Sequence, residues 1–145
     1  MMEPLLISAC LLGVSCRYDG KSKPLPDIEK LKERYALIPV CPEILGGLPT
    51  PRIPSERRGE KVLTEDGRDV TAQYDRGASE ILRLAKFFGC KKALLKERSP
   101  ACGSGKIYDG TFTRTLADGF GVAAELLSEN GVSVFGETQM EELMK

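Results

Sequence analysis

Cysteine is the residue type in this 145-residue chain whose placement most clearly points to chemistry. The five cysteines are Cys10, Cys16, Cys41, Cys90 and Cys102, and the sequence contains no histidine. Any metal site would therefore use thiolate or carboxylate ligands, and any general base would be Asp, Glu, Lys, Tyr or Cys. An odd number of cysteines also argues against a disulfide framework and favours buried thiols or a metal site.

The composition is that of an ordinary globular protein, with 41% hydrophobic and 29% charged residues. We expect one domain over residues 1–145 with its own core. Basic and acidic residues number 21 each, so the net charge of zero attracts neither DNA nor an anionic membrane. The apolar stretch 4–14 is too short to span a bilayer and lacks the basic flank of a signal peptide. These features predict a cytoplasmic location and no DNA or membrane partner.

Short apolar runs must position the cysteines. The runs are rich in Leu, Ile and Val and predict strands covered on both faces, at residues 4–10, 35–41, 91–97 and 132–136. Helical spacing of apolar residues lies between them, at residues 27–35, 69–89 and 113–131. This alternation predicts an α/β fold: a small open parallel sheet of about four strands with helices on both faces, as in Rossmann-like proteins.

Two segments interrupt the alternation. Residues 41–61 contain four prolines and three glycines, which predicts an irregular loop. Residues 60–70 predict a hairpin insertion around Asp66-Gly67. A long loop in a compact domain is more often functional than idle, so we expect residues 41–61 to border a site.

The predicted strands bring most of the cysteines together. Cys10 and Cys41 close the first and second strands, Cys16 follows the first, and Cys102 follows the third. The carboxyl ends of parallel strands line one crevice, where such folds bind ligands. Four thiols should therefore converge there, whereas Cys90 precedes its strand and should lie at the opposite edge.

Several thiols in a reducing compartment suggest an iron–sulfur cluster or zinc. The spacing selects neither, because the sequence has no Cys-x-x-Cys pair. A structural zinc module would use Cys10, Cys16, Cys41 and Cys102. A sulfurtransferase with Cys102 as its nucleophile is a further alternative. Cys90 and Cys41 can also be read as small buried apolar residues.

Three segments resemble a known family: "SACLLGVSCRYDGKSKP" (8–24), "CPEILGGLPTPRIPSE" (41–56) and "ERSPACGSG" (97–105). They closely resemble the signatures of the bacterial thiouracil desulfidases. The resemblance implies a [4Fe-4S] cluster held by Cys10, Cys16 and Cys102, with one iron free for the sulfur of a thiolated pyrimidine. It implies non-redox conversion of thiouracil and water to uracil and hydrogen sulfide, with Glu43 and Ser99 as the acid–base residues.

The chain departs from this pattern at Ala101, where the family often has serine. Glu43 could instead be a solvated loop carboxylate without a catalytic role. Ser99 could instead be a turn serine that bonds its own backbone. Arg52 could hold substrate oxygens or a phosphate; with Glu56 it belongs to the family-like "TPRxPxE" run, which should brace the loop.

Arg57 and Arg58 follow this run directly. They could contact substrate as well, but we expect them to be solvated surface charges. The sequence does not identify the preferred thiolated base or the oligomeric state.

Overall fold

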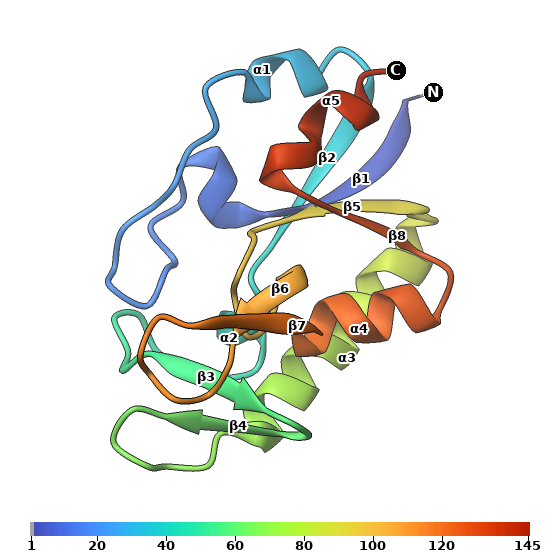
Figure 1. The fold of residues 1–145 in the computed structure, drawn as a ribbon. Coiled ribbons are helices and arrows are strands. Elements are labelled where there is room, and N and C mark those ends of the chain that lie inside the picture. Colours follow the sequence, from blue (N-terminus) through green and yellow to red (C-terminus); the bar gives the residue numbers. More distant parts are fainter. Residues whose placement is uncertain (1) are drawn as a thin grey trace.

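The computed structural model describes residues 2–145 and is built around a four-stranded parallel sheet. Its strands lie in the order β2-β1-β5-β8 (Figure 1). Their bounds are β1 Glu3–Ser8, β2 Tyr35–Val40, β5 Lys92–Leu95 and β8 Ser133–Gly136. The α/β prediction and its four parallel strands are confirmed. The prediction that Cys10 closes the first strand is wrong: β1 ends at Ser8, and Cys10 lies in the 3-10 helix Ala9–Leu12 that follows.

Helices cover both faces of the sheet, as predicted (Figure 1). On one face α3 (Thr71–Phe88) and α4 (Val122–Glu129) pack against alternate strand residues such as Leu6, Ala93 and Leu95. The other face is covered by α1 (Ile28–Leu31), α5 (Met140–Leu143) and the 3-10 helix Ala9–Leu12. A second 3-10 helix, Glu137–Gln139, links β8 to α5. Each fully buried aliphatic side chain here contributes about 1.5–3 kcal/mol.

The first helix is shorter than the predicted 27–35, because Tyr35 belongs to strand β2. α1 spans only Ile28–Leu31, and the Asp27 side chain pairs with Lys30 Nζ at 3.7 Å instead of capping the helix. Tyr35 begins β2, and its hydroxyl donates to the Leu143 carbonyl at 2.7 Å. Pairing with β1 therefore overrides the local helical spacing.

The predicted helix over 113–131 is wrong in its first half. Residues Leu116–Phe120 form β7, which pairs antiparallel with β6 (Ser104–Tyr108), and α4 begins only at Val122. Leu116 and Phe120 fit the apolar face of a helix by spacing, yet they are 37% and 42% exposed. Gly119 and Gly121 weaken a helix at this point, which lets the strand pairing prevail.

The predicted hairpin insertion is present, but its main strand pairing lies earlier in the chain than residues 60–70. β4 (Lys61–Thr64) pairs with β3 (Ser55–Arg58), which lies inside the stretch expected to be an irregular loop. The turn between β3 and β4 uses Gly59 at φ +62°. The predicted turn at Asp66-Gly67 also forms, with an antiparallel bridge from Leu63 to Asp69 and a hydrogen bond from Val70 N–H to the Val62 carbonyl at 2.9 Å. The short helix α2 (Pro42–Leu45) forms within that same stretch.

Two glycines let α2 lie directly against α3. A Cβ on Gly77 would lie 2.0 Å from the Pro42 carbonyl oxygen, and one on Gly46 would lie 2.0 Å from the Gln73 carbonyl oxygen. Neither position leaves space for a methyl group between the backbones. This contact holds the Pro42-Glu43 turn against the longest helix, at the end of β2.

Gly77→Ala should destabilise the protein by about 1–3 kcal/mol, because the added methyl must push α2 away from α3. At an unhindered helix position the same change would be stabilising, since alanine is the better helix former. Chemical denaturation measures the difference, with exposed Ser79→Ala on the same helix as the control. Unchanged or increased stability of Gly77→Ala would contradict the tight contact.

Candidate active site

Four of the five cysteines line one cavity at the carboxyl edge of the sheet. Cys10, Cys16, Cys41 and Cys102 all border this cavity of about 530 Å³. The convergence predicted for these thiols is thus what the structure shows. Cys90 lies before β5, and the charge that raises its pKa, beyond burial, belongs to Glu3 at the start of β1. It therefore sits at the opposite edge, as predicted.

The loop after β1 presents Cys10 and Cys16 to the cavity. The 3-10 helix ends at Gly13, whose φ of +100° favours glycine. The Cys10 carbonyl accepts hydrogen bonds from the N–H groups of Gly13 (3.2 Å) and Lys23 (2.9 Å), which fold the loop back on itself. Cys10 and Cys16 are only 7% and 3% exposed.

Ser99 shapes the turn that carries Cys102. Its Oγ accepts hydrogen bonds from the N–H groups of Ala101 (3.0 Å) and Cys102 (3.1 Å), and Ser99 also lines the cavity. The oxygen thus bonds the backbone of its own turn, as expected for a turn serine. Ala101 is fully buried within the core, so the departure from the family pattern places a methyl group among apolar neighbours.

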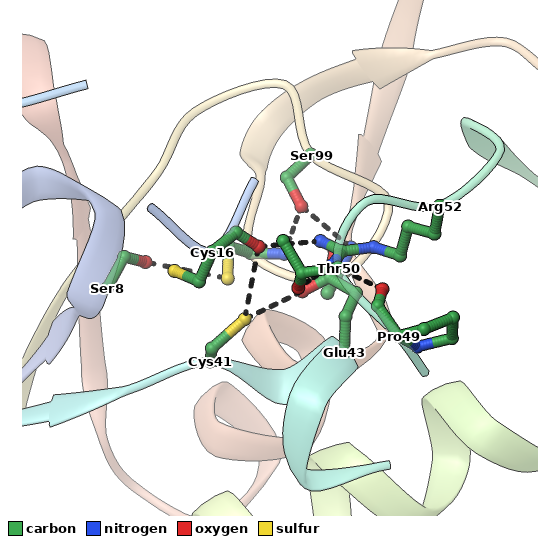
Figure 2. Close-up of polar contacts among 10 residues, drawn as sticks. Ser8, Cys16, Cys41, Glu43, Pro49, Thr50, Arg52 and Ser99 are labelled. Atoms are coloured by element: carbon green, nitrogen blue, oxygen red, sulfur yellow. Dashed lines mark hydrogen bonds and ion pairs between the residues drawn. The ribbon is translucent and has the colours of Figure 1, made fainter. Parts of the chain in front are cut away.

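Glu43 is a buried carboxylate at the start of α2, not a solvated one. The residue is 8% exposed, and its Oε2 lies 3.9 Å from Arg52 Nη2. On the other side, the Cys41 thiol lies 3.8 Å from Oε1 and 3.9 Å from the Cys16 carbonyl (Figure 2). A carboxylate held between a guanidinium and a thiol, inside a cavity, is a candidate acid–base group.

Arg52 links the long loop to the loop that carries Cys16. Its Nη2 donates to the Cys16 carbonyl at 3.1 Å, and its backbone N–H donates to the Tyr18 carbonyl at 2.8 Å. Its Nη1 bonds Pro49 O and Thr50 Oγ1, as Figure 2 shows. The expected bracing role of Arg52 is therefore present in the structure.

Glu56 and its neighbours hold a second loop beside the cavity. Its buried Oε1 accepts hydrogen bonds from Gly110 N (3.0 Å) and Phe112 N (3.1 Å). Arg58 Nη2 donates to Gly110 O at 2.7 Å. Arg57 pairs with Glu125 at 2.7 Å with its side chain only 14% exposed. Arg57 is thus a structural residue, which corrects the expectation of a solvated charge.

Several cavity residues were not identified from sequence. Tyr74 lines the cavity but counted only as a member of the apolar face of α3; Lys96, Arg98 and Phe112 also line it. Arg98 and Phe112 have φ of +69° and +60°, a strained backbone that sequence does not reveal. Lys96 could have been identified, since it lies one residue before the end of the predicted strand 91–97, where the crevice should lie.

Burial keeps the cavity thiols protonated in the metal-free protein. Desolvation, followed by the charges of Cys41 and Glu43, raises the pKa of Cys10 to about 11 even though Lys96 opposes it. Desolvation and Glu43 raise the pKa of Cys41 to about 12. Burial raises the pKa of Cys102 well above its ordinary value. A thiol of this kind is a poor nucleophile by itself but becomes a thiolate when it binds metal.

The donor set suits a cofactor larger than a single ion. Within residues 2–145, no three His, Cys, Asp or Glu side chains meet closely enough to hold one metal ion. The sulfurs instead surround a cavity, which disfavours the closed tetrahedral zinc module. Thiol ligands without imidazole are the donors of iron–sulfur clusters.

A parallel α/β sheet whose carboxyl edge holds four thiols beside a buried Glu–Arg pair is a ligand-binding crevice with donors that suit a sulfur-ligated cofactor. The model of the 2-thiouracil desulfurase family matches residues 5–139, and the chain belongs to this family of enzymes. The family expected from the three motifs, and the carbon–sulfur bond cleavage it implies, are confirmed.

Two individual relatives match the chain over nearly their full length. A solved structure named "[4Fe-4S]-dependent thiouracil desulfidase TudS" has a TM-score of 0.92 and 48% identity, covering 98% of this chain and 95% of that chain. The "Uncharacterized protein YbbK" of Bacillus subtilis (strain 168) is 39% identical over 150 residues, which is 97% of this chain and 99% of that protein.

The metal-free protein should lose stability as pH rises from about 9 to about 12. The unfolded thiols ionise near 9.0, before the folded Cys10 and Cys41, so alkaline pH favours unfolding. The free energy of unfolding, measured against pH, should fall less steeply in Cys41→Ala than in Cys90→Ala. Equal slopes in the two variants would show that the Cys41 thiol is not held protonated.

Proposed function

We propose that this chain converts a thiolated pyrimidine and water to the oxygenated pyrimidine and hydrogen sulfide, using a [4Fe-4S] cluster held by Cys10, Cys16 and Cys102, in the cytoplasm. The carrying observation is that these three cysteines and Glu43 border one cavity. The solved neighbour, a [4Fe-4S]-dependent thiouracil desulfidase, supports the cofactor and the substrate class. A cavity of about 530 Å³ is of the size that accepts a small molecule.

The fourth cavity thiol, Cys41, is left outside the ligand set in this proposal. It lies against Glu43 Oε1 at 3.8 Å, and its pKa of about 12 keeps its proton in place at neutral pH. A neutral thiol there can donate to the carboxylate. When bound, a cluster with three protein ligands supplies a Lewis-acidic iron that can take the sulfur of a thiocarbonyl group.

Glu43 is the proposed general base. With Arg52 beside Oε2 and the Cys41 thiol beside Oε1, the carboxylate is held in one orientation and still has acceptor sites for water. It accepts a proton from the water that attacks the ring carbon. The oxygen of that water stays on the ring and its two protons leave with the sulfur, so the reaction transfers no net electrons.

Ser99 is the proposed hydroxyl donor. Two backbone N–H groups already occupy its oxygen, which leaves its single proton free for a ring oxygen or nitrogen of the substrate. The same two bonds hold the turn of Cys102, so Ser99 orients a cofactor ligand and the substrate together.

Basic side chains outnumber acidic ones around the cavity, six against four: Arg17, Lys23, Arg52, Lys96, Arg98 and Arg114 against Glu43, Glu56, Glu65 and Glu97. This excess offsets the negative charge that thiolate ligands bring into a buried site. The sulfurtransferase alternative is less favoured, because burial holds Cys102 as a protonated thiol that is 4% exposed.

Anaerobic reconstitution with iron and sulfide tests the proposal. The protein should become brown, with broad absorbance near about 400 nm, and should release sulfide from 2- or 4-thiouracil. Cys16→Ala should lose both the colour and the activity, whereas Cys41→Ala should keep the cluster and most activity. A colourless protein that remains active would contradict the proposal, and the reverse result for the two variants would change the ligand set.

Glu43→Gln should keep the cluster but lower kcat by about a hundredfold to ten-thousandfold, because the amide cannot accept the proton. Turnover and the cluster's absorbance, measured on the same sample, separate loss of chemistry from loss of cofactor. Glu65→Gln, at another cavity-lining carboxylate, is the matched control and should retain activity. A fully active Glu43→Gln enzyme would remove Glu43 from the mechanism.

A further inference from the structure

Ser8 lies between the ends of β1 and β5 and contacts Cys102, a proposed cluster ligand. It is the last residue of β1 and is 3% exposed. Its Oγ accepts a hydrogen bond from the backbone N–H of Lys96 at 2.9 Å. Its hydroxyl donates to Cys102 Sγ at 3.5 Å. Figure 2 labels Ser8 on the left, with a dashed line leaving its hydroxyl.

The sheet determines the direction of the Ser8 proton. A serine hydroxyl has one proton and two acceptor lone pairs, so the bond from Lys96 N–H leaves the proton for another partner. Ser8 is 3% exposed, and the acceptor that its hydroxyl reaches is Cys102 Sγ. Parallel pairing of Ile7 with Leu94 keeps the ends of β1 and β5 side by side, and so holds this geometry.

We propose that Ser8 is a positioning residue for the cofactor: its hydroxyl, oriented by the end of β5, holds the Cys102 sulfur and stabilises negative charge on it. The inference rests on the proposed function, in which Cys102 is a cluster ligand. Hydrogen bonds to cluster sulfurs raise the reduction potential, because they favour the more negatively charged reduced state. Partners of metal ligands also strengthen metal retention.

The neighbouring polar groups bond partners other than the Cys102 sulfur. Lys96 Nζ bonds Glu137 Oε1 at 3.0 Å and Glu97 O at 3.2 Å, while the N–H of Cys102 donates to Ser99 Oγ. Ser8 therefore supplies a donor that the loop around Cys102 does not provide from its own residues. If the hydroxyl served only to satisfy Lys96 N–H, its loss would leave the electronic properties of the cluster unchanged.

The test uses the reconstituted 145-residue protein and three variants: Ser8→Ala, Ser8→Thr and Ser55→Ala. Ser8→Thr keeps a hydroxyl, and Ser55 lines the same cavity from β3 as the matched control. The readouts are the midpoint reduction potential of the cluster and the rate at which a chelator removes iron. Ser8→Ala should have a lower potential and release iron about tenfold faster or more, while the other two variants should stay close to wild type.

The outcomes separate this inference from the proposed function. If wild type loads its cluster and Ser8→Ala matches it in potential and iron release, the role of Ser8 is overturned and the desulfidase proposal stands. If Ser8→Thr changes as much as Ser8→Ala, packing and not the hydroxyl is responsible, and the role is again overturned. If wild type takes up no cluster, both proposals fail.

Discussion

Parallel pairing of β1 with β2 and β5 is the constraint on which the site depends. Ser8 pairs with Val40 and Ile7 with Leu94, so these three strands end at nearly the same level. The segments that carry the four cavity cysteines begin immediately beyond those ends. Because Leu5, Leu6 and Ile7 are fully buried between the two helical layers, a slip in register would expose apolar side chains and scatter the thiols at the same time.

Two features limit unpaired charge in the cavity: Glu43 pairs with Arg52, and the thiols stay neutral. Glu43 is buried but faces Arg52, so the structure does not leave an isolated charge in an apolar environment. Burial keeps the cysteines protonated until a metal can replace their protons, which avoids four like charges in one cavity. The same burial that disfavours a nucleophilic thiol thus prepares a set of ligands.

The sheet and the convergence of thiols could be predicted because short aliphatic runs in alternation with helical spacing permit few topologies. Glu43 and Ser99 came from the resemblance of whole motifs, since a glutamate or serine by itself carries too little information. The hairpin β6–β7 was missed because Leu116 and Phe120 mimic helical spacing, and only pairing with Ser104–Tyr108 reveals the strand. Phe112 was missed because its position depends on hydrogen bonds to distant Glu56.

Strand β3 restricts where insertions and deletions can occur in the sequences of homologues. Successive residues of a strand point to opposite sides, and here Glu56 binds the loop at Gly110 and Phe112 while Arg57 pairs with Glu125 on α4. Deleting one residue between Arg52 and Glu56 would exchange the two sides and place a guanidinium where two N–H donors need an acceptor. Homologues should therefore vary in length at the exposed Asp66-Gly67 turn, and keep a constant spacing from Arg52 to Arg57.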